Sequence, residues 1–190
     1  MNTKIKSASI VTLLTKHPLW NKIRYPMLCI GLSWVYALCS QIIIPLPFNL
    51  VPLSIQPLPV TLLTLIMGWP AIIAYVLYLA QGIAGAPFFA GLGYGINHFT
   101  GPTGGYLMGF LIAALFLNAS RRINPSSKLL TLLKLEIANV ITFACGLAYL
   151  SFFVPANKLL LAGLIPFLVG DFVIKALAQV IIVSACFKTK

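Results

Sequence analysis

The chain has 190 residues, of which 60% are apolar and 8% are charged, and its mean hydropathy is +1.00. Soluble domains carry about 25% charged residues, so this composition excludes an ordinary soluble protein and indicates a polytopic membrane protein of one domain. The net charge is +11, and 11 of the 13 Lys and Arg residues gather in three clusters, at residues 4–24, 121–134 and 188–190. Such clusters are typical of the cytoplasmic segments of membrane proteins, and they argue against nucleic-acid binding.

We expect residues 1–190 to form a single all-α integral membrane domain with both termini in the cytoplasm. Residues 1–24 are interpreted as a basic cytoplasmic lead-in, because the apolar stretch at 8–14 contains polar residues and no small-residue cleavage site follows it. Residues 25–187 are expected to form a bundle of six transmembrane helices, since about 20 helical residues cross a bilayer core. The predicted spans are residues 25–44, 60–69, 70–89, 102–119, 128–154 and 167–187.

The segment between the first two spans, residues 45–59, contains five prolines and no charged residue. Backbone that lacks so many N–H donors cannot form a helix and is not tolerated against lipid, so we predict a lid packed on the outer face of the bundle. Residues 90–101 are expected to form a glycine-rich outer loop. Residues 155–166 are expected to return to the outer side with a short surface helix.

The segment GPTGGYLMGF, residues 101–110, combines a helix start with a face made of small residues. Gly105, Gly109 and Ala113 recur every four residues, which lets a helix or a ligand approach the backbone closely. Gly105 is expected to admit a ligand and Gly109 to pack against a neighbouring helix. The hydroxyl of Tyr106 needs a hydrogen-bond partner if it is buried.

The chain has only two acidic residues, and both lie in predicted spans. Asp171 and Lys175 are four residues apart, so they share one helix face and are expected to pair inside the bundle. Ionisable residues within a membrane usually mark a substrate pathway, although such a pair could also merely fix helix packing. Glu136 is interpreted as an interfacial or packing residue, with a proton relay as the alternative.

No enzyme activity is expected, because no nucleophile–base pair, metal-ligand cluster or nucleotide-binding loop is recognisable. The four cysteines are widely spaced, and His98 is interpreted as a solvated loop residue, so no metal or cofactor is predicted. Any ATP-driven transport would need a partner that hydrolyses ATP.

Four segments, IPLPFNLVPLSIQ, APFFAG, GPTGGYLMGF and PFLVGDFVIKA, resemble in order the BioY family, the biotin-binding S components of energy-coupling-factor (ECF) transporters. The resemblance implies a multi-pass protein of the bacterial cell membrane with a biotin pocket near its outer surface. It also implies partnership with a transmembrane coupling protein and two ATPase subunits. By motif position, the ligand-binding residues would be Gln56, Phe88, Asn97, Tyr106, Asp171 and Lys175.

The first helix of S components often presents alanines at four-residue spacing to the coupling protein. In this chain the corresponding ridge is made of Cys29, Ser33 and Ala37. All three side chains are small, but only Ala37 is an alanine. We therefore expect this ridge to form the docking surface for the coupling protein.

The side chains of Asp171 and Lys175 suit biotin, whose ureido group presents two N–H donors and one carbonyl acceptor. The ligand carboxylate would then lie near the mouth of the pocket, close to Lys158 or His98. Alternatively, Lys175 binds the carboxylate and the ureido group faces Tyr106 and Asn97.

Two other functions remain open. The chain could be a stand-alone ion-coupled or facilitative carrier for biotin or a similar vitamin, with Asp171 or Glu136 as a proton site. It could also be an assembly protein that binds no small molecule.

Overall fold

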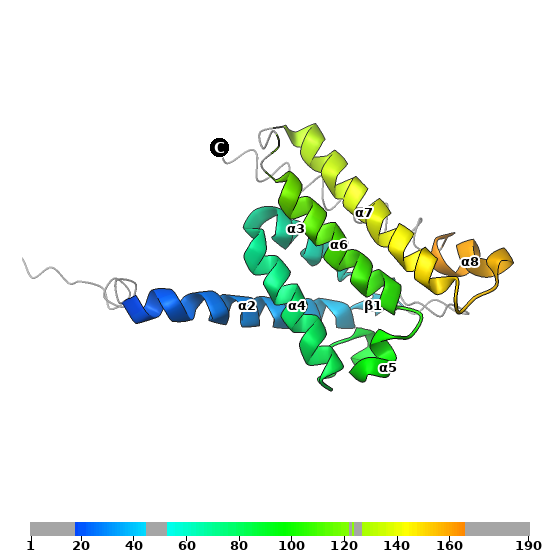
Figure 1. The fold of residues 1–190 in the computed structure, drawn as a ribbon, viewed down its shortest axis with the longest axis horizontal. Coiled ribbons are helices and arrows are strands. Elements are labelled where there is room, and N and C mark those ends of the chain that lie inside the picture. Colours follow the sequence, from blue (N-terminus) through cyan, green and yellow to red (C-terminus); the bar gives the residue numbers. More distant parts are fainter. Residues whose placement is uncertain (1–17, 45–52, 122, 124–126, 166–190) are drawn as a thin grey trace, which may run out of the picture.

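The computed structural model describes residues 18–44, 53–121, 123 and 127–165, and in these ranges the chain is mostly helical (Figure 1). Most of the predicted lid and the whole sixth span, residues 167–187, lie outside the described residues. The elements are α2 (Pro18–Gln41), β1 (Ile43–Ile44), β2 (Leu53–Ser54), α3 (Pro57–Met67), α4 (Trp69–Ile83), η1 (Ala90–Leu92), α5 (Gly95–Phe99), α6 (Gly104–Ser120), α7 (Lys128–Leu150) and α8 (Ala156–Gly163).

The first helix differs from its prediction at both ends. It begins at Pro18, within the predicted lead-in, and ends at Gln41, before the predicted end of the span. The chain then forms β1, which pairs with β2 in an antiparallel register of Ile43 with Ser54. The described chain is mostly helical, as predicted, and this two-residue pairing satisfies backbone groups on either side of residues 45–52.

A tight turn joins α3 to α4 at Gly68, whose φ is 71°. Prolines near the start of each helix fix both starts, at Pro57 and Pro70. Arg121 from the end of α6 reaches this turn, and its Nη2 donates to the carbonyl of Ile66 at 2.7 Å. A Cβ atom on Gly68 would lie 2.0 Å from Nη1 of Arg121, so the turn needs glycine for its conformation and for this contact.

The neighbouring helices α6 and α7 pack closely through glycines of α6 (Figure 1). A Cβ atom on Gly109 would lie 2.9 Å from the carbonyl oxygen of Thr142, which confirms the predicted packing role of Gly109. A Cβ atom on Gly105 would lie 2.3 Å from the Cβ of Tyr149, so α7 covers this glycine as well. At the other end of the pair, Ser127 caps α7 by accepting a hydrogen bond from the amide of Leu130.

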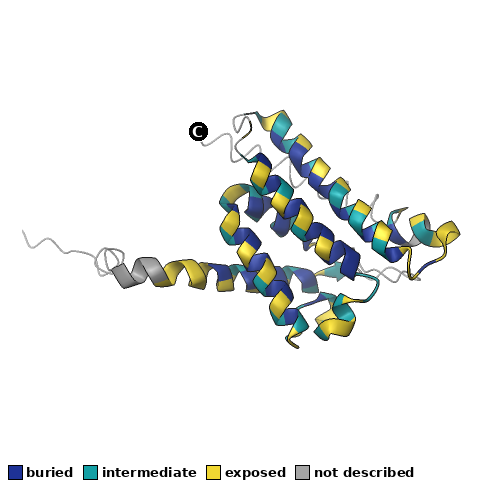
Figure 2. Cartoon of the chain, viewed as in Figure 1, coloured by how far each residue is buried: buried dark blue, intermediate teal, exposed yellow. Residues whose placement is uncertain are grey.

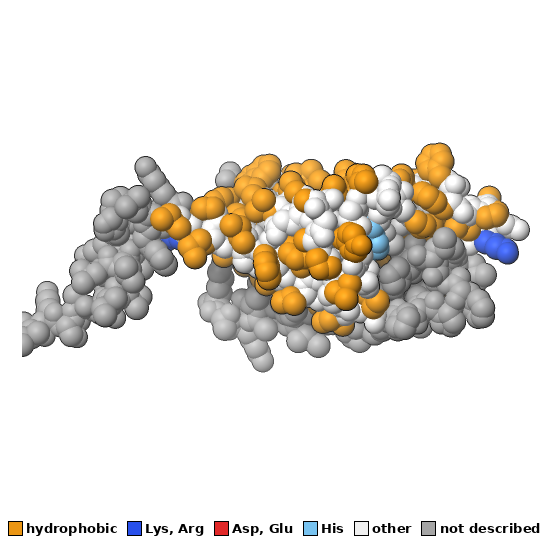
Figure 3. Space-filling model, turned by 90° about the horizontal axis from the view of Figure 1, so that it is seen from below, with side chains coloured by type: hydrophobic (Ala, Val, Ile, Leu, Met, Phe, Trp, Pro, Cys, Tyr) orange, Lys and Arg blue, Asp and Glu red, His pale blue; other side chains and the backbone are white. Residues whose placement is uncertain are grey.

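Buried residues lie along the faces of the helices that meet one another (Figure 2). Many of the exposed residues are large and apolar. The exposed fractions of Leu38, Val140 and Trp69 are 67%, 60% and 59%. In Figure 3 apolar side chains spread over the described surface, and Lys and Arg appear only towards its two ends. Soluble proteins rarely expose so much contiguous apolar area.

Two described helical segments are long and apolar enough to cross a membrane, Ile23–Gln41 and Lys128–Leu150. The apolar helices α3, α4 and α6 are shorter, with 11, 15 and 17 residues. At 1.5 Å per residue, α3 rises about 16 Å, roughly half of a hydrocarbon core. The apolar surface and these helices agree with the membrane location that the composition indicates.

Replacing Gly109 by Ala should lower the free energy of unfolding by about 1–3 kcal/mol, because the added methyl group must push α7 away from α6. The measurement is the melting temperature of the purified protein in detergent. The matched control is Gly31→Ala on α2, where a Cβ atom would meet nothing within 4 Å. This control should melt at the wild-type temperature or slightly above it, since alanine favours a helix over glycine. Equal shifts for the two variants would contradict the packing role.

Candidate ligand-binding site

The structure describes the positions of Gln56, Phe88, Asn97 and Tyr106 among the predicted ligand-binding residues. Gln56 lies just before α3, and Phe88 lies in the turn that follows α4. Asn97 is on α5 and Tyr106 is on α6. Asp171 and Lys175 lie outside the described residues.

Gln56 and Phe88 meet around a residue that sequence reasoning missed, Tyr78 of α4. The rings of Tyr78 and Phe88 are nearly parallel, with centroids 6.4 Å apart and an interplanar angle of 8°. The Tyr78 hydroxyl adjoins the side chains of Gln56 and Ser40. Neither side chain reaches it with the distance and angle of an ordinary hydrogen bond. We call Ser40, Gln56, Tyr78 and Phe88 the Tyr78 cluster. Buried tyrosines in an apolar helix were the signal that could have identified it, since their hydroxyls require partners.

The turn that carries Phe88 is held by the end of α2. Gln41 donates from Nε2 to the carbonyls of Phe88 and Phe89, at 3.1 and 3.0 Å. Its Oε1 accepts from the amide of Leu92 at 2.9 Å. Ser40 also donates to the Phe88 carbonyl. One amide side chain therefore satisfies both the donors and the acceptors of an irregular turn, and so fixes the place of the Phe88 ring.

The cluster contains two buried polar atoms without a hydrogen-bond partner, Nε2 of Gln56 and the hydroxyl of Tyr78. The exposed fraction of Gln56 is only 2%, and Tyr78 is fully buried. Leaving such a group unpaired costs about 1–3 kcal/mol, and native proteins keep few of them. Among the described side chains, Thr64 has the other atom of this kind, farther along α3.

Tyr106 belongs to a different part of the structure. Its hydroxyl donates to the carbonyl of Gly163 in α8 at 2.8 Å, which supplies the partner expected for a buried tyrosine. Its ring occupies the space above Gly146 of α7, where a Cβ atom would lie 2.3 Å from it. It packs with Leu150 and Val154, in a cluster separate from that of Tyr78. Asn97 is exposed on α5, so the described residues bring together only Gln56 and Phe88 of the predicted set.

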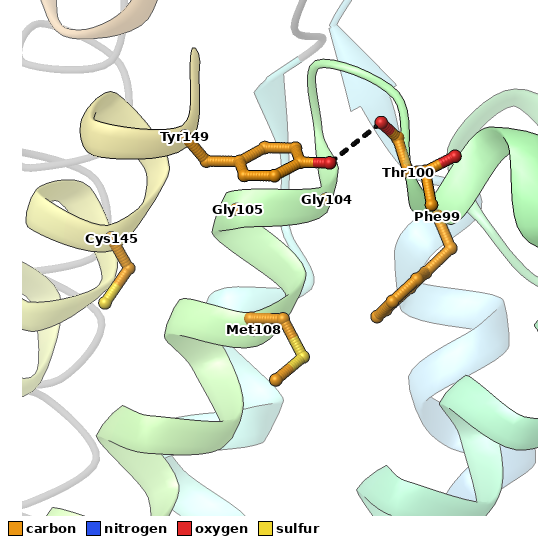
Figure 4. A pocket seen from close by; sticks show the side chains of 7 residues that line it. All are labelled: Phe99, Thr100, Gly104, Gly105, Met108, Cys145 and Tyr149. Atoms are coloured by element: carbon orange, nitrogen blue, oxygen red, sulfur yellow. Dashed lines mark hydrogen bonds between the residues drawn. The ribbon is translucent and has the colours of Figure 1, made fainter. Parts of the chain in front are cut away.

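An apolar groove of about 210 Å³ opens between α6, α7 and the segment before α6 (Figure 4). Gly104 and Gly105 form part of its wall, and Tyr149 closes one side by donating its hydroxyl to the carbonyl of Thr100 at 3.0 Å. None of the lining side chains is charged, and this hydroxyl is already engaged. Ligand sites usually contain a few polar groups that orient the ligand, so the Tyr78 cluster is the better candidate.

His98 and Lys158, the two residues expected near the mouth of the pocket, differ in whether they can bind a ligand carboxylate. His98 stacks on Phe89, with ring centroids 5.3 Å apart, and lies against Gly93. Burial lowers the pKa of His98, so the imidazole is neutral at pH 7 and offers no charge to a ligand carboxylate. Lys158 is exposed on α8. Of the two residues expected near the mouth, Lys158 alone is the charged one at neutral pH.

The carboxylate of Glu136 accepts a hydrogen bond from Asn139, three residues further along α7, at 3.4 Å. The neighbouring Lys134 is buried and donates to the carbonyl of Ile123. Within the described ranges, His, Cys, Asp and Glu form no group of three that could hold a metal ion.

The predicted docking ridge on α2 lies inside the molecule. The exposed fractions of Cys29, Ser33 and Ala37 are 1%, 0% and 7%. Gln81 of α4 donates to the hydroxyl of Ser33 at 3.1 Å. The small side chains therefore let α4 pack against α2, and a separate coupling protein cannot reach them in this arrangement, which corrects the expectation.

The fold is that of a known class of membrane protein. It is similar to a crystal structure described as the S component for biotin from an ECF-type ABC transporter, with a TM-score of 0.73 and 23% sequence identity. The likeness covers 88% of this chain and 93% of the solved one.

Sequence comparison identifies the family. The BioY family model matches residues 8–189, so the chain belongs to the BioY family. A probable biotin transporter BioY of Pyrococcus horikoshii is 36% identical over 135 residues, covering 70% of this chain and 78% of the relative. A biotin transporter BioY of Thermotoga maritima is 30% identical, covering 73% and 82%.

Replacing Gln41 by Leu should loosen the turn at residues 88–92, because it removes the three hydrogen bonds to this backbone. Hydrogen–deuterium exchange of the Leu92 amide should become at least several times faster in this variant. The control is Gln81→Leu, which removes a hydrogen bond between α2 and α4 but none to the turn. Unchanged exchange at Leu92 in Gln41→Leu would show that the turn does not depend on this side chain.

Proposed function

We propose that this protein is the biotin-binding membrane subunit of an ECF-type transporter. Its membership of the BioY family over nearly the whole chain carries this conclusion. Its relatives in Pyrococcus horikoshii and Thermotoga maritima are described as biotin transporters, which supports the choice of ligand. The family consists of transport subunits, so no enzymatic step belongs to this chain.

We further propose that residues 1–190 form one multi-pass domain of the cell membrane, with six transmembrane helices and both termini in the cytoplasm. The three clusters of basic residues support this orientation. The energy for uptake would come from a transmembrane coupling protein and two ATPase subunits, because the sequence contains no nucleotide-binding motif of its own.

In the proposed pocket, Asp171 and Lys175 bind the ureido group. An ionised carboxylate accepts from the two N–H groups, and an ammonium donates to the carbonyl oxygen. Such charge-assisted hydrogen bonds are strong in a dry site, and they fix the orientation of the ligand. Phe88 and Gln56 would form a further wall, since they meet in the Tyr78 cluster. Tyr106 and Asn97 would contact the ligand only from other sides, because Tyr106 packs towards α8 and Asn97 is exposed.

Replacing Asp171 by Ala should weaken biotin binding by about 2–5 kcal/mol, since it removes an acceptor and leaves Lys175 without its partner. Titration of the purified protein with biotin measures this loss. Glu136→Ala is the matched control, because Glu136 is the other acidic residue of the chain and bonds to Asn139 in α7. Wild-type affinity in a folded Asp171→Ala variant would exclude Asp171 from the pocket.

The energy source is tested separately in cells that take up labelled biotin. Dependence on ATP and copurification with a coupling protein and two ATPases would support the transporter complex. Uptake that a protonophore abolishes, while ATP depletion leaves it unchanged, would favour the stand-alone carrier instead.

A further inference from the structure

We propose that the Tyr78 hydroxyl and the Gln56 side-chain amide form a donor pair that binds an sp² oxygen of the transported ligand. This proposal rests on the proposed function, and it adds Tyr78 to the binding residues. Biotin has two groups with such an oxygen, the ureido carbonyl and the carboxylate.

The contrast between three buried tyrosines carries the proposal. Tyr36, Tyr75 and Tyr78 lie in one aromatic cluster, with ring centroids 5.5–6.4 Å apart. The hydroxyl of Tyr36 donates to the carbonyl of Ala71, and that of Tyr75 donates to the carbonyl of Leu107. The hydroxyl of Tyr78 is just as buried but donates to nothing. The Tyr78 hydroxyl is therefore the one hydroxyl of these three tyrosines that has no hydrogen-bond partner.

The polar neighbours of Tyr78 do not supply that partner in this arrangement. Ser40 has one hydroxyl hydrogen, which the carbonyls of Ala37 and Phe88 share, and its oxygen accepts from Nε2 of Gln41 at 3.0 Å. The side chain of Gln41 is engaged at both its oxygen and its nitrogen. Gln56 adjoins Tyr78, and its own Nε2 also lacks an acceptor. Nε2 of Gln56 and the Tyr78 hydroxyl are thus two neighbouring donors that both lack an acceptor. A single acceptor oxygen between them could accept both hydrogen bonds.

The chemistry of the pair defines the group that it binds. The amide nitrogen of Gln56 can only donate, and the Tyr78 hydroxyl can donate alongside it. A carbonyl or carboxylate oxygen has two lone pairs and can accept both bonds. The Phe88 ring, parallel to that of Tyr78, adds an apolar wall suited to a flat ligand.

The surrounding structure holds the donor pair in place before a ligand binds. Gln56 follows β2, which pairs with β1 at the end of α2. Phe88 is fixed by Gln41 and Ser40, from that same end of α2. Both sides of the cluster are thus attached to one helix end. A preorganised site of this kind loses little conformational freedom on binding.

The test compares Tyr78→Phe with the matched control Tyr75→Phe, which alters the same helix three residues earlier. In Tyr78→Phe, biotin affinity should fall about 5- to 30-fold, the loss expected for one buried hydrogen bond to the ligand. The melting temperature without biotin should stay the same or rise, because the substitution removes an unpaired buried hydroxyl. In Tyr75→Phe the melting temperature should fall and the affinity should remain that of the wild type.

Gln56→Leu provides an independent variant. It should weaken biotin binding similarly, and the double variant should lose less than the product of the two single losses, because both side chains contact one oxygen. Wild-type affinity in both single variants would overturn the proposal. So would a fall in the ligand-free melting temperature of Tyr78→Phe equal to that of Tyr75→Phe, since it would reveal an internal partner for the hydroxyl.

Two biotin analogues identify the oxygen. In one, sulfur replaces the ureido oxygen, and in the other a methyl group replaces the carboxylate. The difference between wild type and Tyr78→Phe should disappear for the analogue that lacks the bound oxygen. A difference that persists with both analogues would overturn the proposal. A wild-type protein that does not bind biotin at all would overturn the proposed function, and with it this inference.

Discussion

The candidate site depends on how the irregular turn after α4 is hydrogen-bonded. A helix satisfies most of its own peptide groups, but a turn takes its partners from side chains or water. Gln41 supplies them to the turn after α4, bonding to the carbonyls of Phe88 and Phe89 and to the amide of Leu92. The position of the Phe88 ring, and so one wall of the Tyr78 cluster, follows from these bonds.

Side chains also provide hydrogen-bond partners for irregular backbone at the opposite side of the structure, around the turn between α3 and α4 and after α6. Arg121 donates to the last turn of α3, and Lys134 donates to the carbonyl of Ile123. Both cations therefore satisfy backbone oxygens where the chain leaves its helices. The clustering of basic residues is the pattern that favours one orientation in a membrane. In this structure two of those residues also complete the hydrogen bonding of the fold.

The sequence predicted the features that depend on composition and periodicity. The apolar spans that fall within the described ranges correspond to helices. The four-residue spacing of small residues in α6 predicted a helix contact, and the structure shows that α7 makes it. Spacing could not tell which surface a small-residue ridge contacts, so Ser33 was placed on a docking surface although it bonds to Gln81. Tyr78 and Gln41 were missed because their roles arise from contacts between segments more than 20 residues apart in the chain, between Gln56 and Tyr78 and between Gln41 and Phe88. Local pattern contains no information on such contacts.

The turn between α3 and α4 has an evolutionary consequence. Any side chain at position 68 would occupy the space taken by the guanidinium of Arg121, and most would also oppose the left-handed backbone there. A shorter residue at position 121 would relieve the crowding but would leave the Ile66 carbonyl without its donor. A residue other than glycine at position 68 would therefore require a different backbone turn as well as a displaced Arg121 side chain, so two residues 53 positions apart determine one turn.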